Sequence, residues 1–346
     1  MPTNSRILTA GGIILDSVIA VDGRTSIEQM GGNAVYSAVG AALWSRNVAI
    51  AGNVPANYPE AFLGAMGVAG IIRTGIVRRD DVVDEAEWFL HEADGSRQDH
   101  IYGPRRLFCA AGLGPGPVDP TQRARFAALL RSRTPEGMTF GGFRAKYPVT
   151  IEQALAAGTD VRMVHLAPER PDVLAALART FRARGAIVSL DPGYVAVREP
   201  SEKVEAILSD IDIFLPSERE LSVLRPGVAF PEALRQLAAC VRLVVGVKLG
   251  SRGALILERS SGRMLHVPAV PVTAVDPVGA GDAFCGGFAA CYLASGDAFE
   301  AALCGTVSAS LVVEGFGALH ALGTDPSKVE SRLRQVRSTI GAENIQ

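Results

Sequence analysis

The chain has 346 residues, 48% of them hydrophobic, and a formal net charge of −2. This length and apolar content exclude a disordered chain and predict a large α/β domain, or two smaller domains. The small net charge gives no electrostatic reason to expect nucleic acid or anionic lipid as a partner. Its longest charge-free apolar stretches fall short of the ~18 residues that would predict a membrane span.

The five cysteines are odd in number, lack C-x-x-C spacing, and lie mostly in apolar surroundings. We therefore expect reduced thiols and no zinc site. The first ten residues lack a basic start followed by a long apolar core, so no secretory signal is expected. Both observations predict a cytoplasmic protein.

The N-terminal third predicts one buried strand, two strand-rich blocks and a helix. An apolar strand is predicted over residues 6–16, with Asp16 at its C-terminal end. Ligands bind at the C-terminal ends of the strands in open α/β sheets. Residues 18–27 predict two short strands, and residues 75–102 form a second strand-rich block. Between them, the sequence Gly-Gly-Asn at 31–33 opens a helix of small residues, with Asn33 as the expected N-cap. A local role for Asp16, in a turn, is the alternative.

The rest of the chain alternates helix-like and strand-like segments. The strand-like segments are short, apolar and unalternating, as expected of parallel strands buried on both faces. Alternation of this kind predicts right-handed crossovers and a doubly wound sheet flanked by helices. Helices are predicted over 122–131, 151–157, 171–184, 299–313 and 326–337, strands over 138–140, 163–166, 186–190, 211–215 and 243–247, and a surface loop over 103–120. No histidine is assigned a role, and His91, His100 and His266 are expected to face solvent.

Two segments after predicted strands combine polar residues with helix or turn signals. Ser217 and Glu220 have the spacing of a capping box at a helix start. The segment VKLGSRG contains Lys248, Gly250 and Gly253. It is either a hairpin turn or a loop whose glycines let the backbone approach a phosphate, with Lys248 as a point charge.

The most informative stretch is DPVGAGDAFCGGF, residues 276–288. Gly279, Ala280 and Gly281 form a short loop that runs into an apolar helix. Because the first amides of a helix lack intrahelical acceptors, and glycines permit close approach, the segment suits a phosphate group. Asp282 would repel that phosphate unless it handles a proton. The local alternative is that Asp282 only caps the helix.

This stretch resembles the C-terminal signature of the ribokinase-like (pfkB-type) family of sugar and nucleoside kinases, usually D-T-x-G-A-G-D-x-F-x-x-G. The segment GGNAVYSAVG, residues 31–40, is similar to the N-terminal signature of that family, and the two lie about 250 residues apart as in family members. Pro277 stands where the family has Thr, and Ser217 where its N-x-x-E element has Asn. The resemblance covers nearly the whole chain and thins between residues 103 and 148.

The resemblance implies a single ribokinase-like domain over 1–346, with lid strands at about 17–28 and 75–102 that cover the substrate and could also form a homodimer. ATP and Mg²⁺ would be the cofactors, with a monovalent cation as an optional third. By position, the acceptor would meet Asp16, Gly31, Gly32 and Asn33, the nucleotide Ser217, Lys248, Gly250 and Gly253, and the metal Glu220.

The implied reaction transfers the γ-phosphoryl group of ATP to a hydroxyl, which we expect to be a primary CH₂OH of a small sugar or sugar derivative. Asp282 would be the general base and the amides of Gly279, Ala280 and Gly281 the anion hole. The helix N-terminus should lower the pKa of Asp282, which a loose transition state tolerates.

Three alternatives stay open: a nucleoside acceptor, a binding sensor of the same fold, and a phosphorylated or acidic sugar held by Arg105 and Arg106. For these two arginines a solvated surface pair is the favoured interpretation. A P-loop, a dinucleotide fingerprint and a G-x-S-x-G elbow are absent from the sequence.

Overall fold

The computed structural model describes residues 6–94, 96–114 and 116–343, and within these the strands form two sheets. The larger sheet has nine strands in the order β13-β12-β11-β10-β9-β8-β1-β4-β5 and is parallel except for its antiparallel edge hairpin. Its strands are β1 (Arg6–Ala10), β4 (Val48–Val54), β5 (Ile72–Arg78), β8 (Val161–Leu166), β9 (Ile187–Leu190), β10 (Ile213–Phe214), β11 (Val244–Lys248), β12 (Ala254–Glu258) and β13 (Met264–Val267). The predicted doubly wound, mostly parallel architecture is confirmed.

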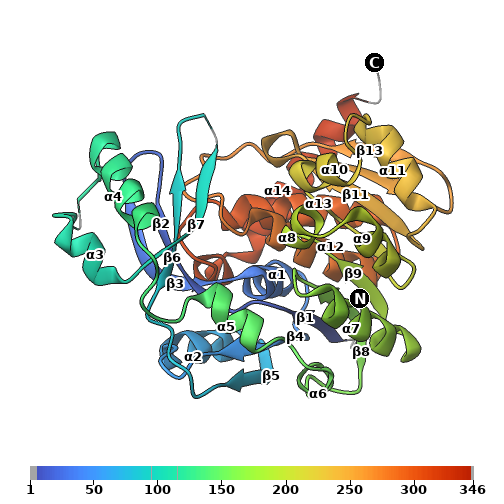
Figure 1. Ribbon diagram of the computed structural model, residues 1–346. Helices are drawn as coiled ribbons and strands as arrows, with labels where there is room; N and C mark the ends of the chain where they lie inside the picture. The colour runs from blue at the N-terminus through green and yellow to red at the C-terminus, as the bar shows by residue number, and fades with distance from the viewer. Residues whose placement is uncertain (1–5, 95, 115, 344–346) are drawn as a thin grey trace.

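Helices cover both faces of this sheet (Figure 1). One face carries α1 (Asn33–Ala42), α2 (Glu60–Val68), α12 (Ala280–Ser295), α13 (Ala298–Val312) and α14 (Pro326–Glu343). The other carries α6 (Ile151–Leu155), α7 (Pro171–Ala183), α9 (Ser201–Leu208), α10 (Glu218–Leu224) and α11 (Phe230–Ala238). Successive strand residues point to opposite faces, so in β10 Ile213 joins one hydrophobic cluster and Phe214 the other. This explains why the strands are apolar throughout.

The smaller sheet has the order β3-β2-β6-β7 and lies at one end of the molecule (Figure 1). Its strands are β2 (Ile14–Ile19), β3 (Thr25–Gly31), β6 (Ala86–His91) and β7 (Arg97–Gly103). The helices α3 (Arg105–Ala110) and α4 (Pro120–Ser132) cover one side of it, where the rings of Trp88, Phe108 and Phe126 pack together. The small sheet therefore has a core of its own.

Two predicted strand boundaries near the N-terminus are wrong. The strand predicted over 6–16 is two strands in different sheets, because the chain turns at Gly11, where a Cβ would lie only 2.7 Å from that of Ala167. Asp16 consequently belongs to the small sheet. The block predicted over 75–102 begins too early, since β5 pairs with β4 at the edge of the large sheet.

Two further segments differ from prediction. The strand predicted over 138–140 is the start of α5 (Phe140–Lys146), because the Thr139 hydroxyl accepts a hydrogen bond from the amide of Gly142 and caps the helix. The loop predicted over 103–120 contains α3. The remaining short elements are α8 (Tyr194–Arg198) and the 3₁₀ turns Gly250–Arg252 and Leu319–Gly323.

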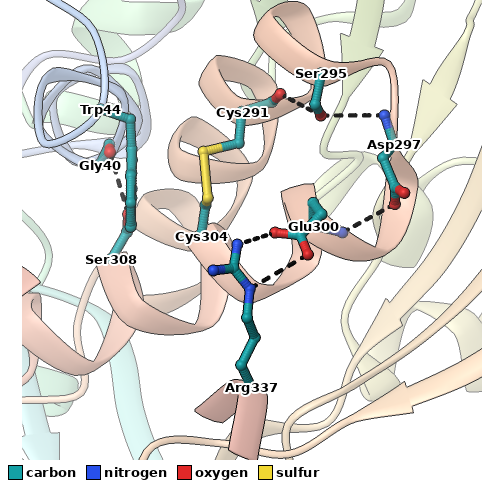
Figure 2. The surroundings of a disulfide bond; sticks show 9 residues. All are labelled: Gly40, Trp44, Cys291, Ser295, Asp297, Glu300, Cys304, Ser308 and Arg337. Carbon is teal, nitrogen blue, oxygen red and sulfur yellow. Dashed lines mark hydrogen bonds and ion pairs between the residues drawn. A yellow bond between two sulfur atoms is a disulfide. The ribbon is translucent and has the colours of Figure 1, made fainter. Parts of the chain in front are cut away.

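A disulfide joins Cys291 of α12 to Cys304 of α13, with 6.4 Å between their Cα atoms (Figure 2). The prediction of reduced thiols is wrong for this pair, because two packed helices bring together cysteines that are 13 residues apart. Nearby, the Ser308 hydroxyl accepts from the Trp44 indole N–H (2.8 Å) and donates to the Gly40 carbonyl (3.1 Å). The disulfide thus joins α12 to α13, and the Ser308 bonds join α13 to the C-terminal end of α1 and to Trp44.

Among the described residues, no helix combines the length and the apolar character that crossing a bilayer requires.

Candidate active site

A cavity of about 510 Å³ lies where the small sheet meets the C-terminal ends of strands β8 to β11 of the large sheet. This is the edge at which ligands bind in open α/β sheets. Ten of the site residues predicted from the sequence line it: Asp16, Gly32, Asn33, Ser217, Glu220, Lys248, Gly250, Gly279, Gly281 and Asp282. Gly31, Gly253 and Ala280 are not part of its lining.

Asp282 lies in the first turn of α12 and faces the cavity. One of its carboxylate oxygens, Oδ1, accepts a hydrogen bond of 3.0 Å from the Asn33 side chain. Gly279 precedes the helix with φ of 77°, and a Cβ there would lie 2.2 Å from the Tyr36 ring, so only glycine fits. The amide of Ala280 already donates to the Pro277 carbonyl (3.3 Å). The open backbone of this loop is therefore that of Gly279 and Gly281.

The expected low pKa of Asp282 is wrong. Burial raises the pKa of Asp282 to about 7, and the Asp191 carboxylate adds to the rise; Lys248 and the bond from Asn33 oppose it. Desolvation of the charged form outweighs the helix N-terminus at this position. Asp282 is consequently suited to accept a proton near neutral pH.

Asp16 combines deep burial with an unmet hydrogen-bonding capacity. Its side chain is 1% exposed, Oδ2 accepts from the Tyr36 hydroxyl (3.0 Å), and Oδ1 has no partner. Burial and the neighbouring Glu87 carboxylate raise the pKa of Asp16 well above its usual value. A buried polar atom without a partner is costly, and a ligand hydroxyl in the cavity would satisfy it.

The Gly-Gly-Asn turn joins these two acids. Gly32, not Asn33, is the N-cap of α1, with φ of 100°. Asn33 is instead the first helical residue, which frees its amide to reach Asp282. Gly31 lies outside the cavity lining but makes room for Asp16, since a Cβ at Gly31 would overlap the Asp16 carboxylate.

At the other end of the cavity, Ser217 and Glu220 form a complete capping box on α10. The Ser217 amide donates to Glu220 Oε2 (2.7 Å), and the Ser217 hydroxyl accepts from the Glu220 amide (3.4 Å). Burial and Asp191 raise the pKa of Glu220. In the described part of the chain, no three His, Cys, Asp or Glu side chains are arranged to hold a metal alone. Mg²⁺ usually takes one or two carboxylates plus water and substrate phosphates, and Glu220 with a bound nucleotide fits that pattern.

Lys248, at the end of β11, forms an ion pair with Asp191, which follows β9. Burial disfavours the charged ammonium, yet the Asp191 carboxylate outweighs it and the pKa of Lys248 is raised. Gly281 lies beside this ammonium, because a Cβ there would be 3.4 Å from Nζ. Gly250 faces open space with φ of 60°. Gly253 is different: its Cβ would lie 2.0 Å from the Val267 carbonyl oxygen, so it shapes the turn.

The small sheet supplies cavity residues that sequence reasoning missed. They are Glu87, Phe89, Arg97, Asp99 and His100 of β6 and β7. His100 lies 3.2 Å from Glu87, which raises the pKa of the imidazole. No local pattern marks these residues, because strand alternation shows only that every second side chain shares a face.

His91 also contradicts its prediction. It is 4% exposed, and its Nε2 lies 3.0 Å from Oδ1 of Asp276, the first residue of the DPVGAGD stretch. The same carboxylate oxygen accepts from the Val278 amide (3.0 Å). A strand of the small sheet thus contacts the loop that precedes Asp282.

Three more cavity residues come from two short helices: Arg144 of α5, which precedes α6 and β8, and Tyr194 and Arg198 of α8, which follows β9. Arg105 and Arg106 are exposed on α3 and lie outside the lining, and Arg106 is 3.4 Å from Glu136. The solvated-pair interpretation of Arg105 and Arg106 therefore agrees with their placement.

Comparison with known proteins gives one family match. A model described as the pfkB family of carbohydrate kinases matches residues 145–325. An ATP-dependent ribose-1-phosphate kinase from Halopiger xanaduensis is 38% identical over 141 residues, 39% of this chain and 42% of that protein. A cytidine kinase from Thermococcus kodakarensis is 24% identical over 287 residues, 83% of this chain and 88% of that one.

Solved structures show the same fold. An Escherichia coli protein described as ribokinase II, in complex with ATP and Mg²⁺, gives a TM-score of 0.69 at 19% identity. The superposition covers 96% of this chain and 99% of that one.

Proposed function

The chain belongs to the pfkB family of carbohydrate kinases, and we propose that it transfers the γ-phosphoryl group of ATP to a hydroxyl of a small sugar or sugar derivative. The observation that carries this proposal is the placement of Asp282. Its carboxylate faces the cavity at the mouth of α12, between the acceptor-side residue Asn33 and the glycine backbone of the loop.

In the proposed reaction, the acceptor oxygen bonds to the γ-phosphorus while the bond from that phosphorus to the β,γ-bridging oxygen breaks and ADP leaves. The acceptor proton passes to Asp282. Since Asn33 occupies Oδ1, the other carboxylate oxygen is the one available for this proton. A pKa near 7 suits a base that works at neutral pH.

The nucleotide would lie at the Ser217 end, with its phosphates toward Gly250, Gly279 and Gly281. Lys248 adds a fixed positive charge beside Gly281, held in place by Asp191. Amides and an ammonium that are already in position stabilise charge on the transferred group without reorganising. Mg²⁺ would neutralise charge on the β- and γ-phosphates, and Glu220 is the carboxylate placed to help hold it.

The acceptor would lie at the Asp16 end, under the small sheet. Asp16 Oδ1 offers a buried acceptor for a substrate hydroxyl. The small sheet would act as a lid, because it closes the cavity with Glu87, Phe89 and Arg97 and so limits access of water, which competes as an acceptor.

A nucleoside is the second candidate acceptor, because the relative that aligns with 83% of this chain is a cytidine kinase, and a ribose ring also offers vicinal hydroxyls to Asp16. The first relative is named for ribose 1-phosphate, so a phosphorylated sugar belongs to the same panel.

The test is ADP release from Mg-ATP with a panel of pentoses, hexoses, sugar acids, sugar phosphates and nucleosides, with the phosphorylated product identified by ³¹P NMR. Turnover of at least one sugar or sugar derivative, lost in Asp282→Asn, supports the proposal. Binding without turnover across the panel would favour a sensor of the same fold. The homodimer, the monovalent cation and the cytoplasmic location stay predictions.

A further inference from the structure

Two arginines from separate helices meet on one tyrosine ring inside the cavity. The guanidinium carbon of Arg144 lies 5.7 Å from the centre of the Tyr194 ring, and that of Arg198 lies 5.3 Å from it. All three residues line the cavity. Stacking on an aromatic ring orients a guanidinium and leaves its N–H groups free for a planar anion.

Neither arginine has a carboxylate partner among the described residues, although two other cations of the cavity, Arg97 and Lys248, do. Arg97 pairs with Asp99 at 2.9 Å, and Lys248 pairs with Asp191. Arg144 donates one hydrogen bond to the Pro168 carbonyl (2.6 Å), and its Nε is buried with no acceptor. The pair therefore carries unbalanced positive charge and an unmet donor.

The acids around this pair are already engaged elsewhere. Glu87 contacts His100 (3.2 Å), and Glu169 accepts from the amide of Arg170 (3.0 Å). Glu169 lies close enough to influence the pKa of Tyr194, which burial raises, but it forms no ion pair with Arg144 or Arg198 in the described structure. An anion brought by a ligand would find no competing carboxylate on these two groups.

The pair lies at the acceptor end. A Cβ at Gly12 would lie 2.9 Å from the guanidinium carbon of Arg144, so the absence of a side chain there makes room for this group. The Gly12 carbonyl in turn accepts from the Ala34 amide (3.2 Å), in the first turn of the helix that carries Asn33. Arg144 is thus packed against the Asp16–Asn33 side of the cavity, whereas the loop proposed to hold the nucleotide phosphates is at Gly279 to Gly281.

We propose that Arg144 and Arg198 bind a phosphate group that the acceptor already carries, so that the substrate is a sugar monophosphate and the product a sugar bisphosphate. This inference rests on the proposed function and deepens it. Two guanidinium groups match the charge of a phosphate dianion and can each donate two hydrogen bonds to it. The acceptor hydroxyl oxygen bonds to the γ-phosphorus as ADP leaves, its proton passes to Asp282, and the existing phosphate ester stays intact.

The first experiment measures kcat/KM of the wild-type protein for four acceptors. They are a free pentose, the same pentose with a phosphate on the carbon farthest from the reacting hydroxyl, the matching sugar acid and the matching nucleoside. We expect the sugar monophosphate to be preferred by about 10- to 100-fold, the value of a charged hydrogen bond. A preference for the free sugar, the sugar acid or the nucleoside would overturn the inference.

The second experiment uses Arg198→Gln and Arg144→Gln, with Arg105→Gln on the exposed face of α3 as the matched control. Arg198 is exposed and makes no described hydrogen bond, so its loss should leave the fold intact. Each cavity variant should lower kcat/KM for the sugar monophosphate about 10- to 100-fold, a larger loss than for the free sugar, without changing KM for ATP. An equal loss for both sugars, or no loss, contradicts a phosphate site.

Binding separates this inference from the proposed function. Calorimetry on Asp282→Asn measures affinity for the sugar monophosphate without turnover. One outcome is that the wild-type protein turns over no acceptor while Asp282→Asn binds the sugar monophosphate and loses that affinity when Arg198→Gln is added. In that case the kinase proposal fails and the phosphate site stands. If turnover is found but the monophosphate binds no better than the free sugar, the phosphate site fails alone.

Discussion

The two ends of the cavity differ in how their polar groups are satisfied. At the nucleotide end, Lys248 is paired with Asp191, and Ser217 with Glu220, within the protein itself. At the acceptor end, Asp16 Oδ1 and Arg144 Nε are buried with no partner. Polar groups that are already paired within the protein are preorganised before a ligand binds, whereas buried donors and acceptors without a partner favour a ligand that supplies the missing hydrogen bonds. Under the proposed function, catalysis and acceptor selection would therefore depend on different parts of the cavity.

The largest effect that tests this division is expected from Asp282→Asn. The change removes the proton acceptor while keeping the side-chain size and an oxygen for the Asn33 amide. Turnover should fall by about two orders of magnitude or more, the usual contribution of a general base, and ATP affinity should be kept. Stopped-flow or coupled measurement of ADP release and calorimetric titration with ATP check the two statements.

The stability of this variant provides its fold control. The folded-state pKa of Asp282 is raised to about 7, so the stability that this group contributes is present at acid pH and lost as pH rises through 7. Asp282→Asn should thus melt no lower than wild type at pH 8. A lower melting temperature there would contradict the raised pKa, and turnover within a few-fold of wild type would remove Asp282 from the proposed role.

Asp16→Asn should act on the acceptor alone. The amide retains the size of the carboxyl group but puts a donor where an acceptor is needed. The expected loss is about 10- to 100-fold in kcat/KM for the sugar, from one buried hydrogen bond, with KM for ATP unchanged. Asp22→Asn, in the exposed turn between β2 and β3, is the matched control and should behave as wild type. A raised KM for ATP in Asp16→Asn would contradict the assignment of Asp16 to acceptor binding alone.

The pH dependence follows from the direction of the Asp282 shift. The base must be unprotonated, so kcat/KM should rise about tenfold per pH unit below its pKa and level off above about 7. Measurement of kcat/KM between pH 5 and 9 in buffers of constant ionic strength checks this. A profile already flat at pH 5 would show that the helix N-terminus, and not burial, controls this carboxyl group.

The same contrast between the two ends explains which parts of the site could be predicted from the sequence. The nucleotide end is built from contiguous motifs, so GAGD and the Ser217–Glu220 spacing are visible in the sequence, and the doubly wound sheet follows from short apolar strands between helices. The acceptor end is assembled from distant segments: Arg144 and Tyr194 belong to two short helices that only the fold brings together. Likewise, apolar surroundings gave no indication that Cys291 and Cys304 would face each other. The sign of the Asp282 pKa shift depends on burial by residues far away in the chain, which no local pattern contains.

The smallest effect should come from Glu220→Gln. This variant tests whether Glu220 helps to hold Mg²⁺ in addition to capping α10. Glutamine can still accept the Ser217 amide, so the capping box is preserved and stability should stay within a few tenths of a kcal/mol of wild type. If Glu220 also helps to hold Mg²⁺, loss of its charge should raise the Mg²⁺ concentration for half-maximal rate by a few-fold to about tenfold. Ser217→Ala is the converse variant: it should lower the free energy of unfolding by about 1 kcal/mol and leave the Mg²⁺ requirement nearly unchanged. Mg²⁺ titrations of ADP release, together with urea unfolding of both variants, separate the two roles. An unchanged Mg²⁺ requirement in Glu220→Gln would leave Glu220 as a helix cap alone.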